Sequence, residues 1–170
     1  LKGNRGREVK KMFSMALWSL LVTAPLQVFI GDLHGLNTLE HQPAKVAAME
    51  GHWENKPGEG VPLILFGWPD MDAETTRYKI EIPNLSSLIL THEWRGQYPG
   101  LKEFAREDRP NATIVFWTFR VMVGLGMLML VLALWSAWSH WRRRAYESRA
   151  LLRFALLMGP SGLIALLAGW

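Results

Sequence analysis

Three long apolar runs stand out against an otherwise polar chain, at residues 12–30, 112–138 and 151–170. An α-helix rises about 1.5 Å per residue, so the first run spans roughly 28 Å, close to the thickness of the hydrocarbon core of a bilayer. Soluble domains instead disperse their apolar residues in amphipathic patterns. A buried core helix is the alternative for any one run. We predict an all-α membrane protein, a fragment of a transmembrane helix bundle with a long loop between its first two helices.

Charged residues flank these runs unevenly. Residues 1–11 hold five Lys and Arg against one Glu, and residues 139–150 hold four Arg against one Glu. The connection at residues 31–111 has eight Lys and Arg and thirteen Asp and Glu. Because the cytoplasmic flanks of membrane helices are enriched in Lys and Arg, we expect both basic segments in the cytoplasm and the acidic loop outside. The net charge of +4 then reflects topology, and no nucleic-acid partner is expected.

The composition excludes several kinds of site, and the ends of the chain indicate a fragment. The sequence of 170 residues contains no Cys, which excludes disulfides, Cys-ligated iron–sulfur clusters, zinc-thiolate sites and covalent c-type haem within it. It opens on Leu1 inside a basic segment and stops at Trp170 inside an apolar run. We therefore expect an internal fragment of a longer protein, with its third membrane helix cut short.

The loop at residues 31–111 carries signals of local structure. Residues 43–53 favour a helix that begins with a proline and continues with alanines. Residues 77–82 alternate polar and apolar side chains and predict an extended strand, and turn-forming residues gather at 67–70. Lys45 and Glu50 are five residues apart, so they lie about 140° apart around the predicted helix. Each could reach one ligand at the helix end, although two solvated charges would explain the same pattern.

Four of the five histidines lie in this loop, and their spacing could suggest a metal site. No pair, however, has the i,i+4 spacing with a carboxylate that a zinc motif requires. We expect surface or hydrogen-bonded side chains at these four positions: His34, His41, His52 and His92.

Arg120 lies eight residues inside the second apolar run. An arginine at the centre of a membrane helix costs about 2.5–3.5 kcal/mol on insertion scales, so it normally faces a partner or a cavity. A carboxylate or a cofactor propionate would suit it, and snorkelling to the outer interface is the alternative. Met122 follows two residues later; a thioether can ligate haem iron, although most methionines in membrane helices serve packing.

Two long motifs resemble subunit I of the cytochrome bd-type quinol oxidases. Residues 31–35 (GDLHG), 40–50 (EHQPAKVAAME) and 53–54 (WE) are similar to the quinol-loop motif of that family, and residues 67–70 (GWPD) and 82–83 (IP) fit the same loop. Residues 116–124 (FWTFRVMVG) resemble the family's segment that bears a haem ligand. The resemblance covers nearly the whole chain in order. The variant at residues 33–37 (LHGLN) and the short loop resemble the cyanide-insensitive branch.

The resemblance implies roles for residues of the loop. Lys45 and Glu50 match the two residues implicated in binding and oxidising quinol, and Asp32 and Gln42 match neighbouring polar positions. The substrate would be ubiquinol or menaquinol, and the partners would be subunit II of the oxidase and the lipid bilayer. The protein would be a multi-pass component of the bacterial cytoplasmic (inner) membrane.

The resemblance also implies haem cofactors. Met122 matches an axial ligand of the low-spin haem b, and Arg120 matches the arginine beside that haem. The second axial histidine of this haem and the ligands of the high-spin haem b and haem d would lie outside these residues. The full-length protein would then oxidise quinol at the outer loop, pass electrons to the low-spin haem b and reduce oxygen in aerobic respiration. We expect the isolated chain to be inactive.

Two other functions remain open on the sequence alone. A transporter or channel fragment would use Arg120 to line a polar path, with the loop as a gate. A membrane scaffold would use the acidic loop to bind a partner, and would tolerate replacement of Lys45, Glu50 and Met122.

Overall fold

The computed structural model describes residues 6–142 and 146–169. Parts of both predicted basic flanks, and the last residue of the third apolar run, fall outside this description. The chain divides into two compact units. We call Leu1–Ile30 with Val121–Trp170 the helical unit, and Gly31–Arg120 the loop unit.

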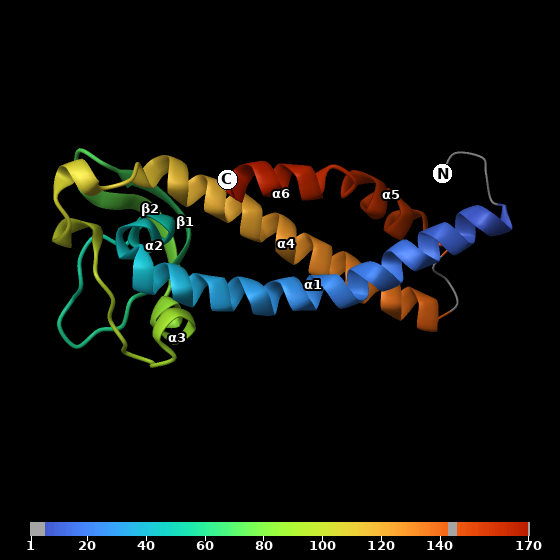
Figure 1. Ribbon diagram of the computed structural model, residues 1–170, viewed down its shortest axis with the longest axis horizontal. Coiled ribbons are helices and arrows are strands. Elements are labelled where there is room, and N and C mark those ends of the chain that lie inside the picture. Colours follow the sequence, from blue (N-terminus) through green and yellow to red (C-terminus); the bar gives the residue numbers. More distant parts are fainter. Residues whose placement is uncertain (1–5, 143–145, 170) are drawn as a thin grey trace. The chain divides into compact units, whose positions relative to one another are not determined.

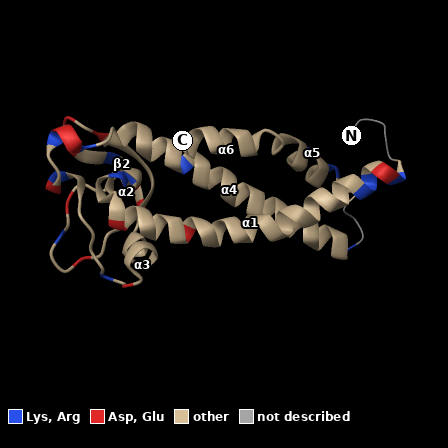
Figure 2. Ribbon diagram, in the orientation of Figure 1, with Lys and Arg blue, Asp and Glu red and all other residues tan. Residues whose placement is uncertain are grey.

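Long helices dominate the molecule (Figure 1). Three stretches are long and apolar enough to cross a membrane, which confirms the predicted helical membrane class: Arg7–His41, Arg106–Trp141 and Arg149–Gly169. Helix α1 (Arg7–His41) has no charged residue between positions 12 and 31, and helix α4 (Ala112–Trp141) has none beyond Arg120 (Figure 2). The membrane placement of these helices, and the side on which each flank lies, stay predictions.

The helix boundaries differ from those expected. Helix α1 passes through Pro25 and continues to His41, so the first eleven residues of the predicted loop are helical. Helix α4 extends three residues beyond its predicted end at Trp138. The third run is not one helix: a turn at residues 158–160 separates α5 (Arg149–Leu157) from α6 (Ser161–Gly169). Pro160 explains the break, since it has no N–H and disfavours helix at the preceding residue.

Within the helical unit, polar contacts join α1 to the later helices. The imidazole of His140 lies 3.3 Å from the Ser14 hydroxyl, and its ring centroid is 6.0 Å from that of Trp18. Large apolar side chains point outward instead of into a core; six of those described are at least 70% exposed, namely Met12, Met15, Trp141, Leu156, Leu157 and Leu166. An outward apolar surface of this kind is what a lipid-facing bundle presents.

The loop unit is a folded region rather than a connector. It contains the end of α1, the start of α4 and, between them, α2 (Pro43–Glu50), β1 (Leu63–Asp70), β2 (Thr75–Ile82), α3 (Leu85–Thr91) and two single-turn 3-10 helices, Leu101–Glu103 and Arg106–Asp108. The predicted helix at 43–53 is confirmed in position but ends early. Gly51 adopts a left-handed φ of 62°, and the N–H groups of residues 51 and 52 bond to the carbonyls of Ala48 and Ala47. This glycine-dependent arrangement stops a helix.

A β-hairpin forms the second feature of the loop unit. Strand β2 includes the predicted extended segment at 77–82 and pairs antiparallel with β1, with Leu63 opposite Ile82 and Asp70 opposite Thr75. The turn expected at residues 67–70 is wrong: these residues belong to β1, whose register is irregular there. The chain reverses just after Asp70, because its carboxylate accepts the backbone N–H groups of residues 72 and 73.

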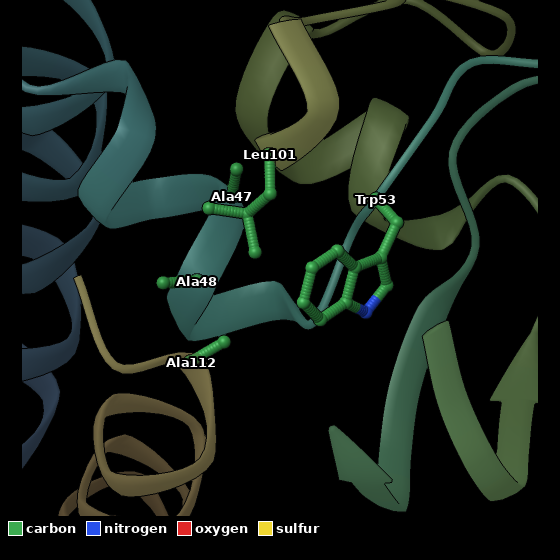
Figure 3. Close-up of a cluster of buried hydrophobic side chains, with 5 residues drawn as sticks. All are labelled: Ala47, Ala48, Trp53, Leu101 and Ala112. Atoms are coloured by element: carbon green, nitrogen blue, oxygen red, sulfur yellow. The ribbon is translucent and has the colours of Figure 1, made fainter. Parts of the chain in front are cut away.

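Small side chains let these elements pack closely (Figure 3). The main cluster brings the buried face of α2 against the residue that begins α4 and the first 3-10 turn; its members are Ala47, Ala48, Trp53, Leu101 and Ala112. A second cluster joins Val46, Val61 and Tyr98. Together the clusters anchor α2 within the loop unit and bury one side of it, so any polar group on that side must find a partner inside the protein.

Candidate functional site

Arg120 and Glu50 form a buried ion pair inside the loop unit. Nη2 of Arg120 lies 3.3 Å from Oε2 of Glu50, and the two side chains are only 15% and 8% exposed. The guanidinium also donates from Nε and Nη2 to the carbonyl of Ile64, at 3.0 and 2.6 Å, and from Nη1 to the carbonyl of Met49, at 2.9 Å. Its Cζ lies 4.3 Å from the ring centroid of Phe116. Arg120 therefore joins α4, the end of α2 and β1 at one point.

Local sequence explains how Glu50 reaches this position. It is the last residue of α2, and the left-handed Gly51 turns the chain away immediately after it. A side chain at position 51 would meet the Phe116 ring at 3.2 Å and the Thr76 hydroxyl at 3.1 Å. Thr76 in turn donates to the Gly51 carbonyl at 2.8 Å and accepts from the Trp53 indole at 3.1 Å. These contacts hold the end of α2 against β2 and α4.

Burial governs the charge state of Glu50. Loss of hydration raises the pKa of its carboxyl above the ordinary 4.5, and the charge and hydrogen bond of Arg120 oppose that rise. The pair lies outside bulk water, so each charge depends on the other. A carboxyl group with a raised pKa can exchange protons closer to neutral pH than a solvated glutamate can.

The other polar residues assigned to the loop are exposed. Lys45 lies on α2 away from Glu50, as the predicted angle between them requires, and Gln42 precedes that helix without a side-chain cap. Asp32 is exposed on α1. None of these three side chains has a hydrogen bond or ion pair with another described residue. The structure thus brings Glu50 and Arg120 together and leaves the remaining loop residues facing outward.

Met122 lies two residues after Arg120 on α4, but in the helical unit. Its thioether lies beside Gly169 of α6, where a Cβ atom would come within 2.8 Å of Sδ. The described residues include no group of three or more His, Cys, Asp and Glu side chains placed to hold a metal ion. Met122 therefore offers one soft ligand of the kind that haem iron accepts.

A carboxylate or a cofactor propionate was expected to suit Arg120, and in the structure its anionic partner is the Glu50 carboxylate. One N–H of Nη1 still has no partner among the described residues. The indole N–H of Trp117, one turn earlier on α4, is likewise buried without a hydrogen-bond partner in the described structure. A carboxylate accepts hydrogen bonds from donors of both types, so these residue types are chemically compatible with a haem propionate. The propionate role stays a prediction.

The sequence did not predict the burial of two aromatic side chains of the loop unit. His52 was expected to be a surface or hydrogen-bonded side chain; it is hydrogen-bonded to Asn55 at 3.0 Å, and it is also buried. Tyr98 is buried, and its hydroxyl lies 2.7 Å from that of Ser86. The ring centroids of His52 and Tyr98 are 5.2 Å apart. Neither position has a periodic pattern or motif that would have indicated its burial.

Comparison with known proteins agrees with the motifs in the loop and in α4. The family model described as cytochrome bd terminal oxidase subunit I matches residues 1–170. The chain is 29% identical to the cytochrome bd ubiquinol oxidase subunit 1 of Bacillus subtilis (strain 168), over 82% of this chain and 32% of the relative. It is 25% identical to the cytochrome bd-II ubiquinol oxidase subunit 1 of Escherichia coli (strain K12), over 98% of this chain and 45% of the relative.

The chain thus spans less than half the length of these relatives. The family match nevertheless extends over all 170 residues, including the helix-end glutamate and the arginine that binds it. The chain belongs to the cytochrome bd terminal oxidase subunit I family.

Proposed function

We propose that this chain is part of the haem-bearing subunit of a quinol:oxygen oxidoreductase in the bacterial cytoplasmic membrane, and that its loop unit oxidises quinol with Glu50 as the proton acceptor. The observation that carries the proposal is the buried Glu50–Arg120 pair, because it places an ionisable carboxyl within the segment that resembles the quinol-loop motif. Ubiquinol or menaquinol would be the substrate, and subunit II of the oxidase would be the partner.

The chemistry of the pair suits quinol oxidation. A quinol that gives up two electrons also gives up two protons, and each proton needs an acceptor as the electrons leave. Burial raises the pKa of Glu50, while Arg120 favours its ionised form. The carboxylate would therefore accept a proton from a quinol hydroxyl, and Arg120 would compensate the change of charge. The exposed Lys45 would hold a quinol oxygen or offset developing negative charge, and Asp32 and Gln42 would be further polar contacts.

Haem b, when bound, would supply one-electron redox chemistry. Met122 would be one residue that holds it through its thioether, and Arg120 and Trp117 would offer N–H donors to its carboxylates. The protein tunes such a group through its ligands, its hydrogen bonds and its burial. The high-spin haem b and haem d of the intact oxidase would be held by residues outside this chain.

Replacing Glu50 by Gln in the full-length oxidase tests the proposal. The change keeps the size of the side chain and removes the titrating group, so we expect quinol-driven oxygen consumption to fall by about 100-fold or more. Haem content, measured by optical spectra, should stay the same. Glu59→Gln is the matched control, because the Glu59 side chain is two-thirds exposed and its carboxylate lies 3.8 Å from Nζ of the exposed Lys56. Full quinol turnover in Glu50→Gln would refute the proposal.

A further inference from the structure

The β1–β2 hairpin has two faces of opposite character. Strand β2 alternates between charged and apolar side chains toward its end, and successive side chains of a strand point to opposite faces of a sheet. Lys79 and Glu81 form an ion pair at 2.8 Å on one face, which leaves Ile80 and Ile82 on the other. Phe66 of β1 lies directly opposite Ile80, so it shares the apolar face.

The charged face of the hairpin lines a polar cavity of about 540 Å³ within the loop unit. Lys79 and Glu81 belong to the lining, together with Thr76 of the same strand. Glu54 and Lys102 add a second ion pair from outside the hairpin, also at 2.8 Å. Both pairs are partly exposed, so the cavity is open to solvent and suited to hold water. This side of the hairpin therefore faces water.

The other side of the hairpin carries large apolar side chains that are not buried. We call four of them, each at least 40% exposed, the apolar face: Phe66, Trp68, Ile80 and Ile82. Trp68 belongs with Phe66 because both rings contact the indole of Trp117, with centroids 6.4 and 5.1 Å away. A contiguous apolar surface beside polar groups is typical of a site that binds a partner or a membrane.

The contact with Trp117 connects the apolar face to the start of α4. Trp117 lies in the stretch Arg106–Trp141, which is long and apolar enough to cross a membrane. Ile114, three residues earlier and thus on the same side of the helix, is 61% exposed. Tryptophan is enriched where membrane helices pass from lipid to water. The apolar face therefore continues the exposed apolar surface of α4 at the end where that helix would enter the bilayer.

We propose that the apolar face of the hairpin lies in the lipid–water interface of the bilayer that α4 crosses. Its rings and isoleucines contact the region between the headgroups and the acyl chains, while the opposite face keeps the Lys79–Glu81 pair in water. A second protein could also cover an apolar surface, but the contact with Trp117 places this one where lipid meets water. The contact with lipid goes beyond quinol oxidation and does not depend on Glu50.

Spin labels in the full-length oxidase complex test this placement. Ile80→Cys and the matched control Glu81→Cys, adjacent in the chain but on opposite faces, each carry one nitroxide in a complex without other reactive cysteines. The complex is placed in nanodiscs of phosphatidylethanolamine and phosphatidylglycerol. Collisions with oxygen, which dissolves in lipid, and with a water-soluble nickel chelate report the depth of each label.

The two labels should differ in depth. We expect the label at position 80 to lie about 5–10 Å inside the boundary between headgroups and acyl chains, as the apolar side of an interfacial element does. The label at position 81 should collide mainly with the nickel chelate. Equal access of the chelate to both labels would overturn the proposal. A label at position 80 that is shielded from both reagents would overturn it too, because protein would then cover the apolar face.

Photolabelling of the unmodified complex needs no substitution, and it decides the question if Ile80→Cys loses its haem. A phospholipid with a diazirine near the top of its acyl chain should form adducts on the apolar face, read by mass spectrometry of residues 63–82. Adducts on the membrane helices without any on this segment would overturn the proposal. Normal quinol turnover in Glu50→Gln would remove the proposed function and leave the contact with lipid standing.

Discussion

Removing Arg120 should weaken the loop unit more than any other single charge change there. Arg120→Met keeps an apolar side chain of similar length but removes four hydrogen bonds, and it leaves Glu50 buried without its cation. Breaking a buried pair by removing one partner costs about 3–5 kcal/mol. The exposed fractions of 15% and 8% place this pair in that class rather than among surface pairs. Two backbone carbonyls, those of Met49 and Ile64, also lose their donor.

Hydrogen–deuterium exchange of the full-length oxidase measures this loss locally. A change of 1.4 kcal/mol is tenfold in an opening equilibrium, so amides at residues 46–52 and 61–66 should exchange about 100-fold to several thousand-fold faster in Arg120→Met. Arg77→Met is the control, because Arg77 pairs with Asp70 on the exposed hairpin and its loss should change little. Exchange in Arg120→Met equal to that in the control would refute the claim that the pair holds α2 and β1 together.

In Arg120→Met, the stability of the loop unit should also depend more strongly on pH. Arg120 lowers the pKa of Glu50 against the effect of burial, so without it that pKa rises further. Between the ordinary value of 4.5 and the raised folded value, the folded state binds the extra proton, and stability falls as pH rises through this window. Arg120→Met should therefore be destabilised less at pH 4 than at pH 7. The double change with Glu50→Gln should remove this pH dependence, and a difference that persists would contradict the assignment to Glu50.

Three further outcomes follow from contacts elsewhere in the chain. Thr76→Val removes an acceptor for Trp53 and a donor to the Gly51 carbonyl, so residues 50–53 should exchange about 5-fold to 100-fold faster, whereas Thr76→Ser should not change them. Met122→Leu in the full-length protein should alter low-spin haem b absorbance and slow quinol oxidation; an unchanged spectrum would count against ligation. The two arginines beside Glu74 lower its pKa, so its contribution to stability is present above pH 4.5 and is lost as pH falls below it. Proteolysis near the hairpin should therefore increase in acid, and less so in Glu74→Gln.

Local sequence patterns were sufficient to predict which long segments are helical. An uninterrupted apolar run of membrane length predicts a helix because the backbone groups must satisfy one another within lipid, and all three runs contain membrane-capable stretches. The helix at α2 and the strand at β2 were also visible, since proline, alanine and alternation act over a few residues. Helix ends were less predictable: α1 continues into the expected loop, and Pro160 divides the third run.

The sequence by itself determined which residues carry unusual chemistry: an arginine within an apolar run, and a lysine and a glutamate in a recognisable loop motif. Only the tertiary structure decided that Arg120 binds Glu50, seventy residues away, and that His52 is buried beside a polar cavity. The physical reason is that a charge inside the protein must be compensated by whichever group the fold brings to it. That group is set by how α2, β1 and α4 pack, and no periodic pattern in the chain records this packing.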